Sequence, residues 1–266
     1  MSKSVMYEVL PTGVAYLTLN KADTHNAFDD AMIQLLIKGI KAAGSDRKVR
    51  VLVLQSTGKT FSAGANLKWM QRMVEYTYAE NHQDALQLSE LMHVLRACPK
   101  PTIAKVQGAA FGGAIGLLAC CNIVVCNQDS KFCLSEVKLG LAPATIAPFV
   151  IEAIGPRLAQ RYMLTAEIFD APTASKMGLV SEIATAENLD AVTERFIQQF
   201  LVNGAQAMTA TKNLISLCSH SIIDDELRDK TAHTIATLRV SDEGQAGLNA
   251  FLKKKPAPWI KQGEKQ

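Results

Sequence analysis

The chain has 266 residues, of which 48% are hydrophobic and 20% are charged, and its formal net charge is +3. This composition is typical of an ordinary globular protein with a large core, and no basic block beyond residues 253–255 favours nucleic acid as a partner. The only long apolar run, residues 108–125, is interrupted by glycines and by Asn122, so we expect no membrane span there.

The cysteines and the N-terminus bear on the cellular compartment. No Cys-x-x-Cys pair is present among the six cysteines, so the sequence favours neither a zinc site nor a disulfide framework. We expect reduced, buried thiols. No apolar signal segment follows the first residues, which favours a cytoplasmic location.

The first hundred residues alternate short apolar runs with amphipathic segments. Residues 5–10 and 14–19 flank a Pro-Thr-Gly turn and predict a hairpin. A helix is expected from Asp29 or Asp30 to about residue 43, ended by Gly44, and residues 49–55 predict a buried strand. A loop over 56–66 leads into a helix from residue 67, and a long helix over 79–97 precedes two prolines.

The next stretch joins a strand to a helix through two glycines. Residues 103–106 predict a buried strand and residues 114–121 a buried helix, with Gly112 and Gly113 between them. A glycine turn that opens a helix presents unpaired N–H groups and the positive end of the helix dipole. This is a candidate site for an anion or for a carbonyl oxygen, although close packing alone would also require small residues here.

The second half of the chain predicts a change of architecture. Residues 123–125 and 131–134 are short extended segments, and from residue 148 onward the pattern is almost wholly helical. Repeated strand–helix units indicate stacked βαβ turns with parallel sheets. The fold class is therefore α/β, and the helical tail is a candidate for subunit contacts because its apolar faces lack an evident partner.

Five motifs resemble those of the crotonase superfamily, the enoyl-CoA hydratases and isomerases, in the same order along roughly residues 5–259. They are residues 25–28 (His-Asn-Ala-Phe), residues 61–68, residues 108–113, residues 132–136 with Gly140 and Pro143, and the ending 243–254. Residues 132–150 look most like bacterial methylglutaconyl-CoA-type hydratases. The resemblance implies a spiral of ββα turns carrying the active site over residues 1–190, and a C-terminal helical region over residues 191–266 that forms trimers, or hexamers made of two trimers.

The resemblance also implies roles for particular residues. The backbone N–H groups of Ala65 and Gly113 would form an oxyanion hole for the thioester carbonyl of an acyl-CoA. Four residues would line the CoA moiety, and two more would reach it at a subunit boundary. The first four are His25, Ala27, Ala63 and Lys68, and the other two are Phe251 and Lys254. Alternatively, Lys68 and Lys254 are solvated surface lysines and His25 is a loop histidine.

Glu136 is the candidate for proton transfer. It is expected at the end of a short strand beside an apolar segment, which predicts a raised pKa suited to acid–base catalysis. A surface glutamate at a strand end is the plain alternative. The sequence departs from the two-glutamate hydratases at Gly116, which stands where they carry a second glutamate. It departs again at residues 144–147, Ala-Thr-Ile-Ala, where many relatives are rich in glycine.

Three functions are therefore compatible with the sequence. The first is a hydratase that adds water to a 2-enoyl-CoA, with a branched methylglutaconyl-type acyl group as one candidate substrate. The second is a Δ3,Δ2-enoyl-CoA isomerase, because a single glutamate suits double-bond migration. The third is a non-catalytic member that binds acyl-CoA or RNA, and the weak charge argues against RNA. We expect neither a metal nor a redox cofactor, because backbone amides polarise the thioester and CoA arrives as part of the substrate.

Overall fold

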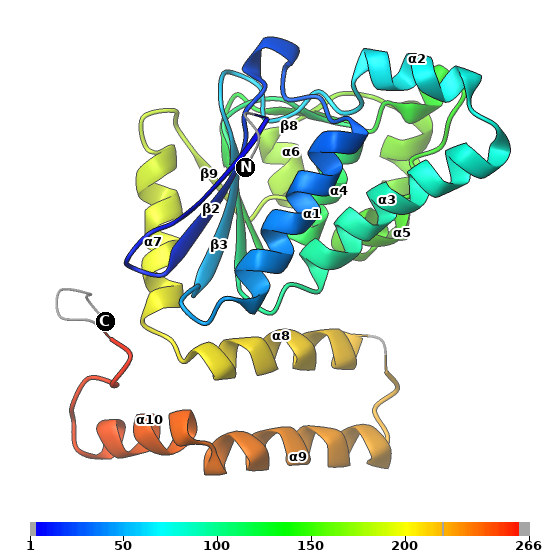
Figure 1. Cartoon of the computed structure of the whole chain (residues 1–266). Coiled ribbons are helices and arrows are strands. Elements are labelled where there is room, and N and C mark those ends of the chain that lie inside the picture. The colour runs from blue at the N-terminus through cyan, green and yellow to red at the C-terminus, as the bar shows by residue number, and fades with distance from the viewer. Residues whose placement is uncertain (1–3, 220, 261–266) are drawn as a thin grey trace.

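A six-stranded sheet forms the centre of the molecule (Figure 1). The computed structural model describes residues 4–219 and 221–260. The strands lie in the order β1 (Val5–Val9), β2 (Val14–Leu19), β3 (Val51–Ser56), β4 (Thr102–Val106), β6 (Ile123–Asn127) and β9 (Glu182–Ala184). The β1–β2 hairpin is antiparallel, as predicted, and every later pair in the sheet is parallel. The α/β fold class is confirmed.

A second sheet has three short strands, β5 (Ala110–Phe111), β7 (Lys131–Cys133) and β8 (Phe169–Asp170). The prediction that the chain is almost wholly helical after residue 148 is wrong at β8 and β9. Both strands are only two or three residues long, so no alternation of polar and apolar residues can develop within them. Their partners, β7 and β6, lie far away in the sequence.

Helices cover both faces of the central sheet. The first seven helices are α1 (Asp30–Ser45), α2 (Leu67–Glu75), α3 (Tyr78–Arg96), α4 (Gly113–Cys120), α5 (Ala147–Thr165), α6 (Ala171–Lys176) and α7 (Leu189–Leu201). Of these, α1 packs on one face of the sheet and α7 on the other. Two 3₁₀ turns, η1 (Ala22–Thr24) and η2 (Glu136–Leu139), lie in the loops. Alternate strand residues face opposite sides, so Leu17 and Leu52 pack in the main core with α1 and α3, whereas Val51 and Val53 pack with α7.

The predicted helix starts agree with their capping residues. The Asp29 side chain accepts a hydrogen bond from the Met32 N–H at 2.8 Å, and Asn66 caps α2. Gly44 does not end α1, which continues to Ser45, because Gly44 keeps helical geometry and the chain turns at Asp46 instead. The helical pattern predicted after residue 148 begins with one kinked element, α5, which has a positive φ of 77° at Gly155.

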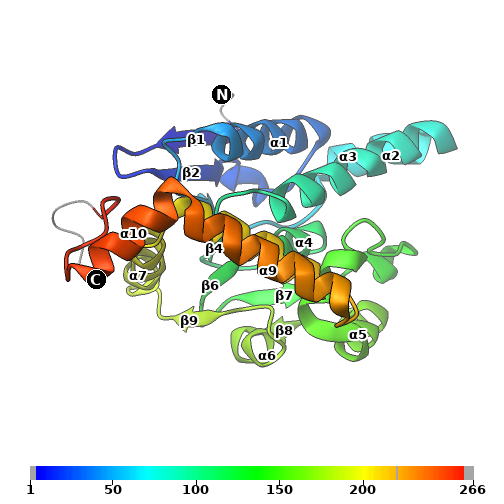
Figure 2. The same cartoon turned by 90° about the horizontal axis from the view of Figure 1, so that it is seen from below.

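The last three helices form an arm below the rest of the molecule, α8 (Ala205–Ser219), α9 (Asp225–Val240) and α10 (Asp242–Leu252) (Figures 1 and 2). Two side chains of α8 tie the arm to the core. Lys212 Nζ donates to the carbonyl oxygens of Cys98 and Lys100 at 2.7 and 2.9 Å, and Thr209 Oγ1 donates to the carbonyl oxygen of Pro99 at 2.8 Å.

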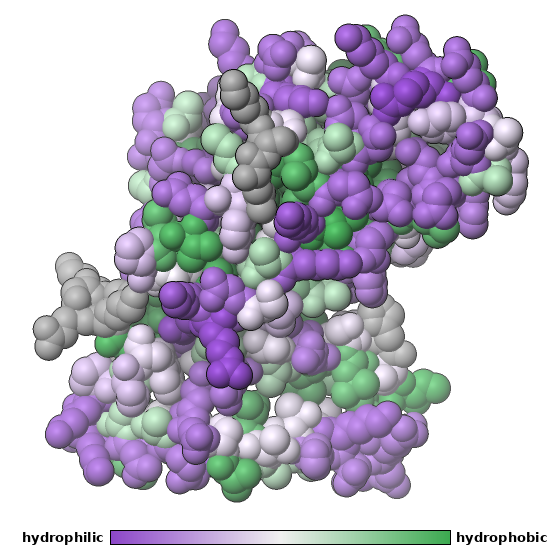
Figure 3. Space-filling view, in the orientation of Figure 1, coloured by the Kyte–Doolittle hydropathy of each residue, from purple (hydrophilic) through white to green (hydrophobic). Residues whose placement is uncertain are grey.

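Large apolar side chains remain exposed on this arm, where Figure 3 shows green patches among the polar residues. They are Ile215, Ile222, Ile223, Ile235, Val240, Leu248, Phe251 and Leu252. The assignment of residues 191–266 to a trimerisation region stays a prediction. Within the part of the chain that the structure describes, no helix has both the length and the apolar character needed to cross a bilayer.

Candidate active site

Two loops that follow β3 and β4 lie against each other. The Ser62 N–H donates to the Ala109 carbonyl oxygen at 3.1 Å, and the Phe111 N–H donates back to the Ser62 carbonyl oxygen at 3.0 Å. Gly64 has a φ of 89°, and a Cβ placed on it would lie 2.9 Å from the carbonyl oxygen of Phe111. A glycine is therefore required at residue 64 for both its conformation and its close approach to the second loop.

The backbone N–H of Ala65 points away from Phe28, the residue that pairs with it in an isolated parallel β-bridge. On either side of Ala65, the Gly64 carbonyl oxygen accepts from the Phe28 N–H at 2.7 Å, and the Asn66 N–H donates to the Phe28 carbonyl oxygen at 2.8 Å. Because successive residues of an extended chain point to opposite sides, the Ala65 N–H faces away from Phe28. It donates no hydrogen bond to the residues that the structure describes.

The backbone N–H of Gly113, like that of Ala65, has no hydrogen-bond acceptor among the described residues. Gly113 is the first residue of α4, and the first N–H groups of a helix have no carbonyl group four residues before them within the helix. Gly112 precedes it with φ 55° and ψ −128°, a conformation that favours glycine, and its own N–H donates to the Cys133 carbonyl oxygen at 2.8 Å. The helix dipole of α4 adds positive potential at this point.

Glu136 places its carboxyl group beside this helix start. It opens η2, three residues after β7, rather than ending the strand as predicted. A Cβ placed on Gly112 would lie 3.3 Å from Glu136 Oε1, so the carboxyl group lies against the glycine turn. Its Oε2 is buried and has no hydrogen-bond partner among the described residues. Burial raises the pKa of the Glu136 carboxyl group above its ordinary value.

The predicted CoA residues fall into two groups. His25, Ala27 and Ala63 lie next to the loops, since the Ala63 N–H donates to the His25 carbonyl oxygen at 3.0 Å, and Lys68 is exposed in the first turn of α2. Phe251 and Lys254 are exposed at and just after the end of α10, on the arm, and no hydrogen bond or ion pair described here joins either side chain to the two loops. A role for these six residues in CoA binding stays a prediction.

Four apolar residues beside the glycines were given no role in the sequence analysis, although Phe28 and Ile146 lie in segments quoted there. A Cβ on Gly113 would lie 3.1 Å from a ring carbon of Phe28 and 3.9 Å from a methyl carbon of Leu88. A Cβ on Gly116 would lie 2.8 Å from the Cβ of Ile146 and 3.0 Å from the sulfur of Met92. These residues come from distant segments, and nothing in their spacing marks them as neighbours.

Asn26 is a further residue that the sequence analysis left without a role. Its side chain is fully buried, with Nδ2 donating to the carbonyl oxygens of Thr57 and Thr60, both at 2.8 Å, and Oδ1 accepting from the Lys21 N–H. It thereby fixes the loop of His25 against the loop that leads to Gly64. In the sequence, only the position of Asn26 beside His25 in a predicted loop pointed to this structural role.

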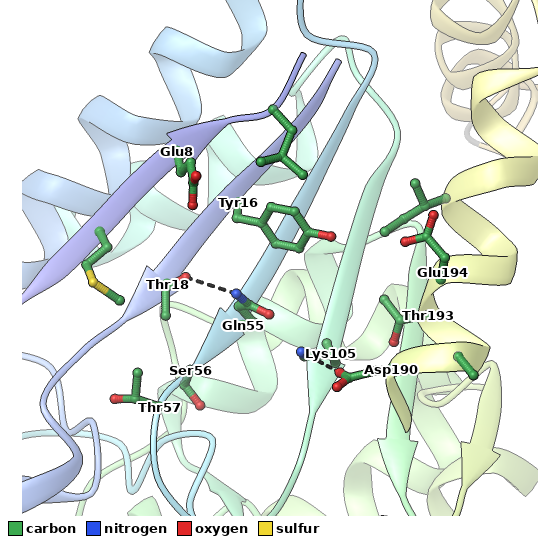
Figure 4. A pocket seen from close by; sticks show the side chains of 14 residues that line it. Glu8, Tyr16, Thr18, Gln55, Ser56, Thr57, Lys105, Asp190, Thr193 and Glu194 are labelled. Atoms are coloured by element: carbon green, nitrogen blue, oxygen red, sulfur yellow. Dashed lines mark hydrogen bonds and ion pairs between the residues drawn. The ribbon is translucent and has the colours of Figure 1, made fainter. Parts of the chain in front are cut away.

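A separate groove of about 810 Å³ lies on the other face of the sheet, between β1–β4 and α7 (Figure 4). Glu8, Tyr16 and Glu194 line it, together with an ion pair of 2.8 Å between Lys105 and Asp190. Burial and these carboxylates raise the pKa of Tyr16. None of the predicted site residues lines this groove. The two loops are the better candidate for chemistry, because unpaired amides and a buried carboxyl group lie together there.

The described residues contain no cluster of side chains that could bind a metal ion. Within residues 4–219 and 221–260, no three His, Cys, Asp or Glu side chains are grouped so that they could hold one. All six cysteines are free thiols, of which Cys98, Cys120, Cys126 and Cys133 are buried. The expectation of buried thiols is wrong for Cys218, which is exposed on α8.

Comparison with known proteins identifies the same fold and family. An enoyl-CoA hydratase from Shewanella pealeana has a crystal structure that superposes with a TM-score of 0.93, at 44% identity over 96% of each chain. An enoyl-CoA hydratase of Alternaria alternata is 35% identical over 92% of this chain and 80% of its own. A trans-2-decenoyl-[acyl-carrier-protein] isomerase of Streptococcus mutans is 28% identical over 95% of this chain and 96% of its own.

The family profile described as enoyl-CoA hydratase/isomerase matches residues 10–262, which is nearly the whole chain. The matching profile, the relatives and the superposed structure all support the family that the five sequence motifs indicated. The chain belongs to the enoyl-CoA hydratase/isomerase family, within the crotonase superfamily.

Proposed function

We propose that the protein is an enoyl-CoA hydratase that adds water to a 2-enoyl-CoA through an enolate intermediate. The observation that carries the proposal is the buried, unpaired carboxyl oxygen of Glu136, beside the turn that leads to the free amide of Gly113. The amides of Ala65 and Gly113 hold the thioester oxygen as negative charge develops on it. By comparison with other enzymes, one such donor contributes about 3 kcal/mol to the transition state.

One carboxylate is sufficient for the reaction. Glu136 removes a proton from water, the water oxygen forms a bond to C3, and the π electrons of the C2=C3 bond move into the thioester enolate. Glu136 then returns the proton to C2 and the thioester carbonyl re-forms, so that one water molecule has been added. The pKa raised by burial makes the Glu136 carboxylate a stronger base and a better proton carrier near neutral pH.

Double-bond migration is the second candidate. Gly116 supplies no second carboxylate, and the space beside it is filled by Ile146 and Met92. In this reaction Glu136 takes a proton from C2 of a 3-enoyl-CoA and returns it to C4, without consuming water. The isomerase of Streptococcus mutans among the relatives is consistent with this alternative.

The acyl group and the assembly are further parts of the proposal. Phe28, Leu88, Met92 and Ile146 form an apolar wall beside the glycines, which suits an unbranched or branched hydrocarbon chain. A methylglutaconyl-type acyl group would also need a cation for its second carboxylate. The exposed Phe251 and Lys254 could reach CoA in a trimer or in a hexamer of two trimers, where the arm of one subunit meets the core of another.

A substrate panel tests the proposed function. Crotonyl-CoA and methylglutaconyl-CoA would lose the ultraviolet absorbance of the conjugated thioester on hydration, whereas a 3-enoyl-CoA would gain it on migration. We expect hydration by the wild type and a loss of about 10³-fold in Glu136→Gln, within the usual range for a general acid–base residue. CoA-ester binding without turnover of any substrate would instead support a non-catalytic member of the family.

A further inference from the structure

The segment that runs from Glu136 to Ile146 lies along the first turns of α4. At one end the Glu136 carboxyl group lies against Gly112, and at the other end Ile146 lies against Gly116. Backbone hydrogen bonds fold the first half of the segment into a turn and join its end to α5. The Leu141 N–H donates to the Glu136 carbonyl oxygen at 3.2 Å, and the Ile146 carbonyl oxygen accepts from the Val150 N–H at 3.0 Å in the first turn of α5.

Gly116 has no room for a side chain while residue 146 is isoleucine. A Cβ on Gly116 would lie 2.8 Å from the Cβ of Ile146, closer than real Cβ contacts allow. Because the Cβ of Ile146 is bonded directly to the backbone, rotation of its side chain cannot relieve this contact. Ile146 is 1% exposed and Met92 is fully buried, so neither has free space to move into.

The glycines at 113 and 116 lie on one face of α4, since residues three apart in a helix are neighbours. The side chains found against this face are apolar at both positions, Phe28 and Leu88 at the first and Met92 and Ile146 at the second. Among the described residues, the only carboxyl group found against these glycine positions is that of Glu136, which lies against Gly112 rather than Gly113 or Gly116. A water molecule next to Gly116 would therefore have no carboxylate to hold it, because Ile146 fills that position.

We propose that Ile146 is a specificity-determining residue, which excludes water from the position beside Gly116 and so lowers the ratio of hydration to double-bond migration. This inference rests on the proposed function, because it assumes that Glu136 transfers the proton in both reactions. Migration breaks a C–H bond, moves the π electrons and returns the same proton, so it needs no water. Hydration needs a water oxygen at C3, and every apolar group near the reacting carbons reduces the space for that water.

The ratio of two rates on one enzyme tests the inference. We would measure hydration of a 2-enoyl-CoA and migration of a 3-enoyl-CoA for the wild type, Ile146→Ala and Ile154→Ala. Ile154 is a buried isoleucine of the same helix and is not among the side chains found against Gly116, so its variant controls for a cavity alone. We expect Ile146→Ala to raise the hydration-to-migration ratio about tenfold, within the discrimination that a few apolar atoms provide, and Ile154→Ala to leave it unchanged.

The outcomes separate the two proposals. An unchanged ratio in Ile146→Ala, with both rates measurable, would overturn the role of Ile146 and leave the proposed function standing. An equal fall of both rates in Ile146→Ala would also overturn the specificity role, because it would show that Ile146 only contributes to packing. A wild type that does not hydrate the 2-enoyl-CoA would refute the proposed hydratase function, and one that turns over neither substrate would refute the inference as well.

A second pair of variants tests the contact between residues 116 and 146 by melting temperature, without an activity measurement. Gly116→Glu alone should lower the melting temperature strongly, because its Cβ meets that of Ile146. Adding Ile146→Gly removes the two Ile146 atoms that the new side chain would meet, Cβ and Cγ2, and glycine is acceptable at this position, the N-cap of α5. We expect the double variant to melt at a higher temperature than Gly116→Glu alone. A single Gly116→Glu variant as stable as the wild type would contradict the steric argument.

Discussion

The glycine-lined start of α4 and the C-terminal arm differ in how completely one chain surrounds them. Side chains from other segments of the same chain meet each glycine at the start of α4, and a Cβ would lie 3.3 Å from Glu136 at Gly112, 3.1 Å from Phe28 at Gly113 and 2.8 Å from the Cβ of Ile146 at Gly116. The arm, by contrast, is tied to the core chiefly through α8 and leaves Ile222, Ile223 and Phe251 more than four-fifths exposed. The proposed proton-transfer site is thus built by one chain, whereas the predicted CoA contacts of the arm require a second chain.

The largest expected effect concerns Glu136. Burial raises the pKa of its carboxyl group, so the folded protein binds this proton more tightly than the unfolded chain, and ionisation costs stability as pH rises through the raised pKa. We therefore expect Glu136→Gln to be about 10³-fold less active but more stable than the wild type at neutral pH. The gain in stability should shrink as pH falls and vanish below the ordinary value near 4.5, as denaturant unfolding at several pH values would show.

The exposed Glu75, changed to Gln, serves as the control for that experiment. It should leave activity unchanged and change the free energy of unfolding by less than about 0.5 kcal/mol. If Glu136→Gln were less stable than the wild type at neutral pH, the carboxylate would be stabilised by partners rather than penalised by burial, and the account of its pKa would be wrong.

The next largest effect tests the connection between arm and core. Lys212→Met keeps most of the alkyl chain but leaves the carbonyl oxygens of Cys98 and Lys100 without their donor. We expect a loss of about 2–6 kcal/mol in the free energy of unfolding, at about 1–3 kcal/mol for each of the two unsatisfied carbonyl oxygens. Lys38→Met, at an exposed position of α1, should cost less than about 0.5 kcal/mol. Equal stability of the two variants would mean that the Lys212 contacts do not hold the arm.

The smallest expected effect concerns Phe251. Because this side chain is 81% exposed within one chain, Phe251→Ser should change the unfolding of the isolated chain by less than about 0.5 kcal/mol. If the arm reaches CoA in an oligomer, the same variant should raise KM for acyl-CoA while kcat changes little. Sedimentation and steady-state kinetics on the same sample would check both. An unchanged KM in an intact oligomer would remove Phe251 from the CoA site.

The sequence was sufficient to predict where the two loops lie along the chain, but not which side chains pack against them. Capping residues such as Asn66, and glycines such as Gly64 and Gly113, act through local backbone geometry, so their positions could be predicted from neighbours in the chain. The contact of Ile146 with Gly116 depends on how α5 packs on α4 and is not encoded in any local pattern. The strands β8 and β9 were missed for the same reason, because pairing rather than composition defines them.

The central claim is that the free amide of Gly113 stabilises the thioester oxygen, and one matched pair of variants tests it. Gly113→Pro removes this N–H at the first helical position, where proline is accepted, and Gly113→Ala keeps the N–H while adding a similar Cβ beside Phe28. With both variants folded, we expect kcat of the proline variant to be about 10²–10³-fold below that of the alanine variant. Equal kcat values would contradict the proposed oxyanion hole.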